Sequence, residues 1–569
     1  MNMKYIKIKY FIPAVVFFTL SGLITSCSKN FLDTKLDIYH TPETISHNYN
    51  TLWSFGNAMY AYLPYGFTEL DGNLFAPASD EAFQTISTAS TVRIYNEGIL
   101  SPLNVGNTGN TYKSLYEGIR RANFFLDYSV DYFNFLTLNR DTTDDGKMQQ
   151  LERDRQDIAW MRGEARIVRA YYYGELLKRY GGVPLITTTF DQSDERNVPR
   201  ASYDEVVNFI VSEIDKYKDS IVVNWKTSQF KGNDGRFSKM SALAVKSRVL
   251  LYAASPRDNP TNDVEKWKRA AEAAKDLINN PQFNLNLFAD YTNLFREANP
   301  TLSTNPEVIL AVRRPPSNTL AVNNYPIGTP GGKTGIAPSH NLVKSYEYTG
   351  TPSASNPYAN RDPRLGAVVT NMNNWNGRDI RMGPGESDDM TRQNATPTGY
   401  YLRKFLPYNM NLQQGATVQF NWIVYRYAEI LLNYAEAMNE AYGPDVVPAG
   451  YPMSARVAQK RVRDRVSTAL PAITTTSVSE FRDRIKHERR VELAFENHRY
   501  WDLLRWKDAE TVLNQPIMGV LVGKTGSTYT FTEVKVDDRN FNAPAMYYFP
   551  FSRTEIVNSN GALTQNPGY

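Results

Sequence analysis

Two glycine-rich segments come close to the loop that wraps the phosphates of a bound nucleotide. Residues 328–334 (Gly-Thr-Pro-Gly-Gly-Lys-Thr) and 519–525 (Gly-Val-Leu-Val-Gly-Lys-Thr) both end in Gly-Lys-Thr. Each is one residue short of the phosphate-binding pattern, so the backbone would not close around a phosphate. Neither segment is set between a clear strand and a clear helix. The sequence therefore does not predict nucleotide binding.

Residues 141–152 resemble a calcium-binding loop more closely. Positions 1, 3, 5, 6 and 12 of that loop would be occupied by Asp141, Thr143, Asp145, Gly146 and Glu152. Position 3 normally carries Asp or Asn, and the threonine there removes a carboxylate. The segment could also be a polar loop that caps a helix beginning near Leu151. Both interpretations stay open.

Other patterns for metal or nucleophilic chemistry are sparse. The acidic pair Asp388-Asp389 could serve glycosidase chemistry, but adjacency in sequence does not give the separation of two carboxylates across a sugar. The sequence contains no G-x-S-x-G nucleophile motif. Its histidines have no pair at zinc-ligand spacing; they are His40, His47, His340, His487 and His498. We expect no metal, no cofactor and no enzymatic activity.

The densest charged segment is 487–507, where acids and arginines alternate among large apolar residues. Glu488, Glu492 and Glu496 each lie within one turn of arginines if the segment is one helix. Apolar residues on several sides imply that the helix is buried, and buried charges need partners. We expect a structural network of ion pairs rather than catalytic carboxylates.

The single cysteine, Cys27, follows an N-terminal segment typical of exported proteins. The apolar run 11–20 is too short to span a bilayer as a helix. Residues 23–26 (Leu-Ile-Thr-Ser) resemble a lipobox, which predicts a signal peptide over 1–26 and acylation of Cys27, as by palmitate. Residues 27–40 would then be a lipidated tether. The alternative is an ordinary secretory signal with a chance cysteine.

The mature chain would be nearly neutral. The sequence has 63 basic and 59 acidic residues. Lys4, Lys7 and Lys9 leave with the signal, so 60 basic residues face 59 acidic ones, a balance of +1. A nearly neutral protein lacks the broad positive field expected of a nucleic-acid-binding protein.

Helical periodicity dominates the chain after the tether. Apolar and small residues repeat at helical spacing over 163–180, 238–255 and about 425–442. The stops after these segments include Pro184, Pro256 and Pro444. The first two stops lie 72 residues apart, near two units of the ~34-residue helix-turn-helix repeat called TPR. We expect a mostly α-helical protein, with residues 307–313 as the clearest strand.

Two long tracts, 67–111 and 315–419, are loop-rich and contain scattered aromatic residues. Loops of this length inside a compact body are usually functional or disordered, and the aromatic content favours function. Aromatic rings can stack on sugar faces, while polar side chains bind hydroxyls. Our candidate ligand-binding residues are Arg93, Tyr95, Asn96, Tyr325, Tyr346 and Trp375.

Several short motifs occur in a fixed order along the chain. They are Phe31-Leu32-Asp33, Ser79-Asp80-Glu81-Ala82, Arg121-Ala122-Asn123, Gly163-Glu164-Ala165-Arg166, Tyr180-Gly181-Gly182-Val183-Pro184, Asp362-Pro363-Arg364-Leu365, Arg426-Tyr427-Ala428-Glu429, the 487–507 segment and Gln565-Asn566-Pro567-Gly568-Tyr569. Together they resemble the SusD/RagB family of outer-membrane nutrient-binding lipoproteins, from Cys27 to the last residue.

The resemblance implies a mostly α-helical SusD-like body over 41–569, with an N-terminal part to about 256 and a C-terminal part from about 257. TPR-like helical pairs would form the scaffold, and a large loop-rich face would bind ligand. It also implies a lipid anchor in the outer membrane, exposure at the cell surface and a SusC-like TonB-dependent barrel as partner.

The ligand would be an oligomeric nutrient, a glycan or a peptide. A non-binding structural lid for the transporter and, least favoured, a surface glycoside hydrolase are the other interpretations. Unlike the loop tract of glycan-binding relatives, the segment between Glu81 and Tyr112 contains no Trp.

Overall fold

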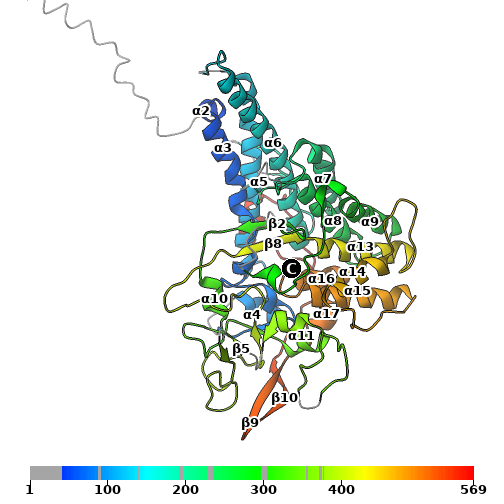
Figure 1. Cartoon of the computed structure of the whole chain (residues 1–569). Coiled ribbons are helices and arrows are strands. Elements are labelled where there is room, and N and C mark those ends of the chain that lie inside the picture. Colours follow the sequence, from blue (N-terminus) through cyan, green and yellow to red (C-terminus); the bar gives the residue numbers. More distant parts are fainter. Residues whose placement is uncertain are drawn as a thin grey trace, which may run out of the picture.

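The computed structural model describes residues 42–86, 91–137, 140–190, 197–226, 233, 235–296, 304–353, 356–370, 374–375 and 377–569. Cys27 and the lipobox lie outside the described residues, so lipidation stays a prediction. Long helices occupy one half of the molecule, and short elements joined by long loops occupy the other (Figure 1). In the described part of the chain, no helix combines the length and apolar composition needed to cross a membrane.

The helical half is built from consecutive helices that pack side by side. α6 lies against α5 and α7, α8 lies against α7 and α9, and α13 lies against α9, α14 and α15. Their bounds are α2 Pro42–Ser46, α3 Tyr49–Asn57, α5 Thr108–Tyr128, α6 Asp145–Tyr180, α7 Tyr203–Tyr217, α8 Lys239–Ala254, α9 Val264–Ile278, α13 Tyr427–Tyr442, α14 Ala455–Val466, α15 Val478–Glu492 and α16 Arg499–Trp506. The fold class is therefore mostly α, as expected; the TPR-like geometry of the pairs stays a prediction.

The loop-rich half carries shorter elements. The helices are α4 Thr91–Asn96, α10 Thr319–Asn324, α11 His340–Ser345, α12 Arg364–Val368, α17 Ala509–Val512 and α18 Arg553–Asn558. The strands are β1 Ala82–Gln84, β2 Val308–Arg313, β3 Ile336–Pro338, β4 Val369–Thr370, β5 Asn374–Trp375, β6 Arg378–Asp379, β7 Tyr401–Leu402, β8 Asn421–Arg426, β9 Ile517–Thr525 and β10 Thr528–Asp537.

The strands of the described residues pair as antiparallel two-stranded sheets. β2 pairs with β8, for example Ala311 with Ile423, so the predicted strand 307–313 is confirmed. β9 and β10 form a hairpin that projects from the body (Figure 1). The glycine-rich segment 519–525 lies in β9 and is extended, which is not the geometry of a phosphate-binding loop.

Three predicted helices are found, with shifted ends. The helix expected over 163–180 begins at Asp145, where Asp144 caps it by accepting a hydrogen bond from the backbone of Lys147. Residues 145–152 are therefore helical and cannot wrap an ion as a calcium loop does. The predicted single helix over 487–507 is wrong. It breaks between α15 and α16, where Phe495 and Asn497 have φ of 64° and 62°.

The predicted ion-pair network of 487–507 is confirmed. Arg505 and Asp502 pair across one turn at 2.8 Å, but most of the pairs join segments that are distant in sequence. Arg426, at the end of β8, contacts Glu307 and Glu492 at 2.7 Å and Glu496 at 2.6 Å. Arg465 of α14 also pairs with Glu307 and Glu492. The side chains of these groups are all nearly fully buried. The network holds β2, β8, α14 and α15 together beneath the loops.

Candidate ligand-binding site

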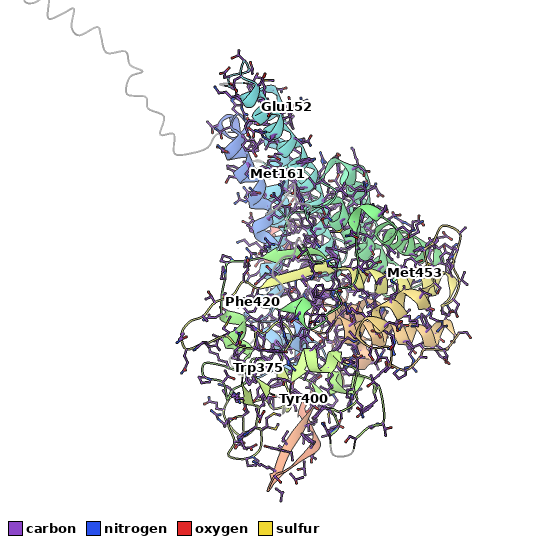
Figure 2. The ribbon with its side chains drawn as sticks, viewed as in Figure 1. Glu152, Met161, Trp375, Tyr400, Phe420 and Met453 are labelled. Carbon is purple, nitrogen blue, oxygen red and sulfur yellow. The ribbon has the colours of Figure 1, made fainter. Side chains whose placement is uncertain are left out.

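A cleft of about 240 Å³ opens in the loop-rich half of the molecule. Figure 2 places Tyr400, one of its lining residues, in that half, far from Glu152 near the tip of α6. The cleft lies among the loop before α12, the helix α12 itself and the approach to β7. Its lining residues are Tyr358, Asn360, Arg361, Asp362, Pro363, Leu365, Gly366, Val369 and Tyr400.

Aromatic rings form one wall of the cleft. The ring of Tyr358 meets the ring of Tyr400 edge-on at 6.0 Å between centroids, and meets Phe531 of β10 at 5.6 Å. The hydroxyls of Tyr358 and Tyr400 lie 3.2 Å apart. Nδ1 of His340 lies 2.8 Å from the Tyr400 hydroxyl. Tyr358 and Phe531 are half-buried, so part of each ring is open to solvent. A half-exposed ring on a rigid support suits stacking on a sugar face.

Arg361 and Asn360 supply the polar side of the cleft. Arg361 donates to the Tyr348 hydroxyl at 3.0 Å and to the Val343 carbonyl at 2.5 Å. Its Cζ lies 4.4 Å from the centre of the Tyr348 ring, a cation–π contact that fixes the guanidinium plane. Asn360 is exposed and has φ of 55°, a conformation that Asn tolerates better than most residues.

The floor of the cleft is anchored to the buried ion-pair network through the Asp-Pro-Arg-Leu motif. Asp362 accepts a hydrogen bond from the backbone of Arg364 at 3.0 Å and pairs with its guanidinium at 2.7 Å. Arg364 in turn contacts Glu488 at 2.6 Å and Glu492 at 2.8 Å. Since all of these groups are buried, the position of α12 is fixed from below.

Burial also sets the charge of the cleft. Desolvation lowers the pKa of His340 from its usual value, despite the nearby Glu533 carboxylate, so its ring is neutral at pH 7. Desolvation raises the pKa of Tyr400, so its hydroxyl stays protonated. The charge of Asp362 is offset by Arg364. Arg361 is therefore the main charge that the cleft presents to a ligand, beside neutral hydroxyl groups and aromatic rings.

Carboxylates near the loops are engaged in structure rather than poised for acid–base chemistry. Asp388 pairs with Arg378 at 2.6 Å and accepts from the backbone of Gly328. Asp389 accepts from the backbone of Gly385 and Thr391. Among the described residues, no three His, Cys, Asp or Glu side chains gather as a metal site.

Two of the predicted ligand-binding residues are accessible, but they lie outside the cleft. Arg93 of α4 is about two-thirds exposed and pairs with Glu97 at 2.7 Å. Asn96 is half-buried, and its side chain accepts a hydrogen bond from Arg539. Arg93 is thus engaged in a local ion pair, and Asn96 in a contact with a segment far along the chain.

The four predicted aromatic residues are buried, which removes them from the set that a ligand could reach in this structure. Tyr325 and Trp375 are 0% exposed, Tyr346 is 1% exposed and Tyr95 is 4% exposed. Trp375 lies edge-on to Tyr325, with ring centroids 5.2 Å apart. Figure 2 places it in the loop-rich half. The indole therefore serves as a core residue of the loop tract rather than as a stacking platform.

Sequence reasoning did not select Tyr358, Arg361, Tyr400 or Phe531. Arg361 directly precedes the Asp-Pro-Arg-Leu motif and Tyr358 lies four residues before it, so proximity to that motif was an available signal. Phe531 lies beside Tyr358, at the edge of the cleft, because the β9–β10 hairpin is joined to the segment before β7, with Val520 donating to the Thr398 carbonyl at 2.9 Å. No local pattern indicates that contact.

Residues 307–569 match the family model described as SusD family, and residues 30–251 match the model described as starch-binding associating with outer membrane. The chain belongs to the SusD family. The two SusD-family matches together take in most of the chain, including both walls of the cleft.

Individual relatives agree with this assignment. The chain is 28% identical to SusD-like protein P38 of Formosa agariphila over 63% of this chain and 68% of the relative. A SusD-like protein from Bacteroides fragilis has the same fold, with a TM-score of 0.75, 24% identity and coverage of 93% of this chain and 98% of that one. A SusD-like carbohydrate binding protein from the same species has a TM-score of 0.70 and 23% identity, covering 90% and 99% of the two chains.

Proposed function

We propose that this SusD-family protein captures an oligomeric nutrient, with a glycan as the favoured ligand, in the cleft beside Tyr358 and Arg361. The observation that carries the proposal is that one cleft of about 240 Å³ brings together the half-exposed ring of Tyr358, backed by Phe531, with tyrosine hydroxyls and the fixed guanidinium of Arg361. Typical pockets for small ligands hold ~300–1,000 Å³. The cleft therefore suits a short segment of an oligomer whose remainder extends over the surface.

The chemistry of the lining favours sugars. The C–H face of a sugar ring can stack on Tyr358 or Phe531, while Asn360 and Arg361 can bind hydroxyl oxygens. The similar carbohydrate-binding protein from Bacteroides fragilis supports this class of ligand. No described carboxylate of the cleft is free to act as a general acid, so we propose capture without catalysis.

Calorimetric titration with a panel of neutral and acidic oligosaccharides, and with peptides of similar length, tests the ligand class. We expect heat from at least one oligosaccharide and none from peptides. Binding of peptides alone would assign the peptide-capturing alternative. Absence of binding to every probe would favour a structural lid. Release of shorter sugars during incubation would instead indicate a glycoside hydrolase.

We further propose that acylated Cys27 anchors the protein in the outer membrane, exposed at the cell surface, and that it delivers its ligand to a SusC-like TonB-dependent barrel. The lipobox-like sequence before Cys27 and the outer-membrane description of the matching family model support this placement. Capture at the surface needs a route across the membrane, which the barrel would supply. Permanent interfaces of this kind commonly bury more than ~2,000 Å².

The anchor and the partner can be tested separately. Cys27→Ala should release the protein from membranes or block its processing; unchanged membrane association with the same acyl signal would refute the anchor. Purification of the tagged wild-type protein in mild detergent should recover a TonB-dependent barrel in near-equal amount. Recovery of the protein alone, with the barrel gene expressed, would refute the partnership.

A further inference from the structure

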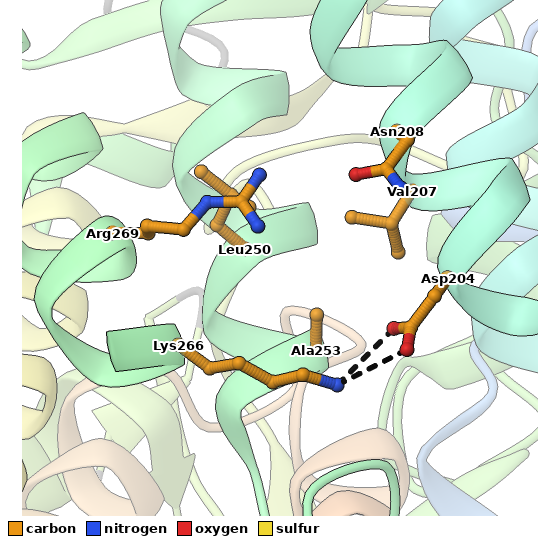
Figure 3. A pocket seen from close by; sticks show the side chains of 7 residues that line it. All are labelled: Asp204, Val207, Asn208, Leu250, Ala253, Lys266 and Arg269. Atoms are coloured by element: carbon orange, nitrogen blue, oxygen red, sulfur yellow. Dashed lines mark hydrogen bonds and ion pairs between the residues drawn. The ribbon is translucent and has the colours of Figure 1, made fainter. Parts of the chain in front are cut away.

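A second pocket lies on the helical scaffold, away from the cleft, where α7, α8 and α9 meet (Figure 3). Its volume is about 150 Å³. A cavity needs roughly 10–15 Å³ to hold one water molecule. The pocket therefore has room for a group of several heavy atoms. Its lining residues are Asp204, Val207, Asn208, Leu250, Ala253, Lys266 and Arg269.

Two solvent-exposed polar side chains, Arg269 and Asn208, lie on opposite walls of this pocket. Figure 3 shows the guanidinium of Arg269, from α9, pointing toward the amide of Asn208, from α7. Within the described part of the chain, neither side chain makes a hydrogen bond or an ion pair. Most other arginines of the described ranges are paired with carboxylates or carbonyls, whereas the exposed guanidinium of Arg269 is held by no protein group and can turn to a ligand in the pocket.

The remaining charges of the pocket are largely balanced. Lys266 is drawn toward Asp204, with Nζ 3.1 Å from one carboxylate oxygen and 3.5 Å from the other, and it also donates to the Asp258 carbonyl. Asp204 and Lys266 offset each other, which leaves the charge of Arg269. The first turns of α7 and α9, where Asp204 and Lys266 lie, also contribute the positive ends of two helix dipoles.

We propose that this pocket binds a small oxyanion, a sulfate or carboxylate group that is either free or carried on a sugar. Arg269 would hold two of its oxygens through parallel N–H donors, since a planar guanidinium matches such groups. The amide of Asn208 would donate to a third oxygen from the opposite wall. Val207, Leu250 and Ala253 form an apolar floor that limits the depth of entry.

Three charge variants of the mature protein test this site with sodium sulfate as the probe. Arg269→Gln removes the unpaired cation and should weaken sulfate binding about tenfold, the loss expected for a hydrogen bond to a charged group. Asp204→Asn should strengthen binding, because it frees Lys266 from its ion pair. Arg155→Gln, at an exposed position on α6, is the matched control and should leave binding unchanged.

Binding is measured by calorimetry and thermal shift, with sodium chloride at equal ionic strength as reference. Sulfate stabilises many proteins by exclusion from their surface, so only a difference between variants counts as site binding. Equal responses in wild type and Arg269→Gln, or no response to sulfate beyond that to chloride, would overturn the proposal.

A sulfated monosaccharide and its unsulfated parent identify the source of the oxyanion. Tighter binding of the sulfated sugar than of free sulfate, lost in Arg269→Gln, assigns the pocket to an acidic glycan. Equal binding of the two assigns it to the free ion. Because the pocket lies on other elements than the cleft, cleft variants such as Tyr358→Ala should not change either result.

Discussion

Replacement of Arg364 by methionine tests whether the buried ion pairs beneath the cleft stabilise the fold and the site. Arg364 is 1% exposed and donates five side-chain hydrogen bonds to three carboxylates. Methionine fills a similar volume without charge. After the change, Glu488 keeps Arg463 and Glu492 keeps two other arginines.

Asp362 bears the main cost of this change. In the described part of the chain it has no cation partner besides Arg364. Removing one member of a buried pair leaves the other charged and unpaired, which typically costs about 3–5 kcal/mol. We expect a loss of this size for Arg364→Met. The double variant with Asp362→Asn should be more stable than Arg364→Met alone, because it removes the stranded charge.

The assay is urea unfolding followed by tryptophan fluorescence, with refolding checked by dilution. Arg155→Met is the control, because the Arg155 side chain is 58% exposed and its one ion pair, with Glu152, is long at 3.8 Å. We expect it to change the free energy of unfolding by at most about 0.5 kcal/mol. The reasoning is refuted if Arg364→Met costs no more than the control, or if the added Asp362→Asn brings no recovery.

Three further predictions concern buried positions of the loop-rich half. Trp375→Ala should lower the free energy of unfolding by about 3–5 kcal/mol, because it empties a fully buried site, and should leave ligand affinity intact; weaker binding by a stable variant would reassign the indole to the ligand. Burial raises the pKa of Glu81 to about 8, from an ordinary value of 4.5. Between these two pH values the folded state keeps a proton on Glu81 that the unfolded state has lost. Stability should therefore fall as pH rises from about 4.5 to about 8, and Glu81→Gln should flatten that part of the pH profile; identical profiles would contradict this. Gly66→Ala should cost about 1–3 kcal/mol, because its Cβ would lie 2.2 Å from the Trp422 indole. Gly366→Ala, with no atom within 4 Å of its Cβ, should cost nothing, and equal losses from the two glycine changes would refute the clash.

Local sequence patterns were sufficient to predict helices and strands whose positions depend on the spacing of apolar residues. The helices over 163–180 and 238–255 and the strand over 307–313 follow from apolar spacing and from glycine or proline stops. The ordered motifs indicated the family because they mark positions where the backbone conformation or a buried charge permits few other residue types. The Asp-Pro-Arg-Leu motif, for example, is where the cleft is tied to the buried network.

Contacts between distant segments could not be predicted in this way. Trp375 lies in a polar, glycine-ended stretch that suggested exposure, yet rings from Tyr325 and Tyr408 enclose it. The apolar pattern of 487–507 continues through Phe495 and Asn497, although the backbone there turns left-handed and ends the helix. The aromatic wall of the cleft likewise depends on Phe531, which a hairpin brings to Tyr358 from far along the chain.

The central claim is that the cleft beside Tyr358 and Arg361 captures a glycan. Its most direct test is calorimetric titration of wild type and Tyr358→Ala with the oligosaccharide that binds best in the panel, alongside Phe133→Ala. Phe133 is 36% exposed in the short 3-10 helix Asp131–Asn134 that follows α5, which makes it an aromatic control outside the cleft. Loss of one stacking ring should weaken binding about tenfold in Tyr358→Ala and not at all in Phe133→Ala. Equal affinity of all three proteins would contradict the assignment of the cleft as the binding site.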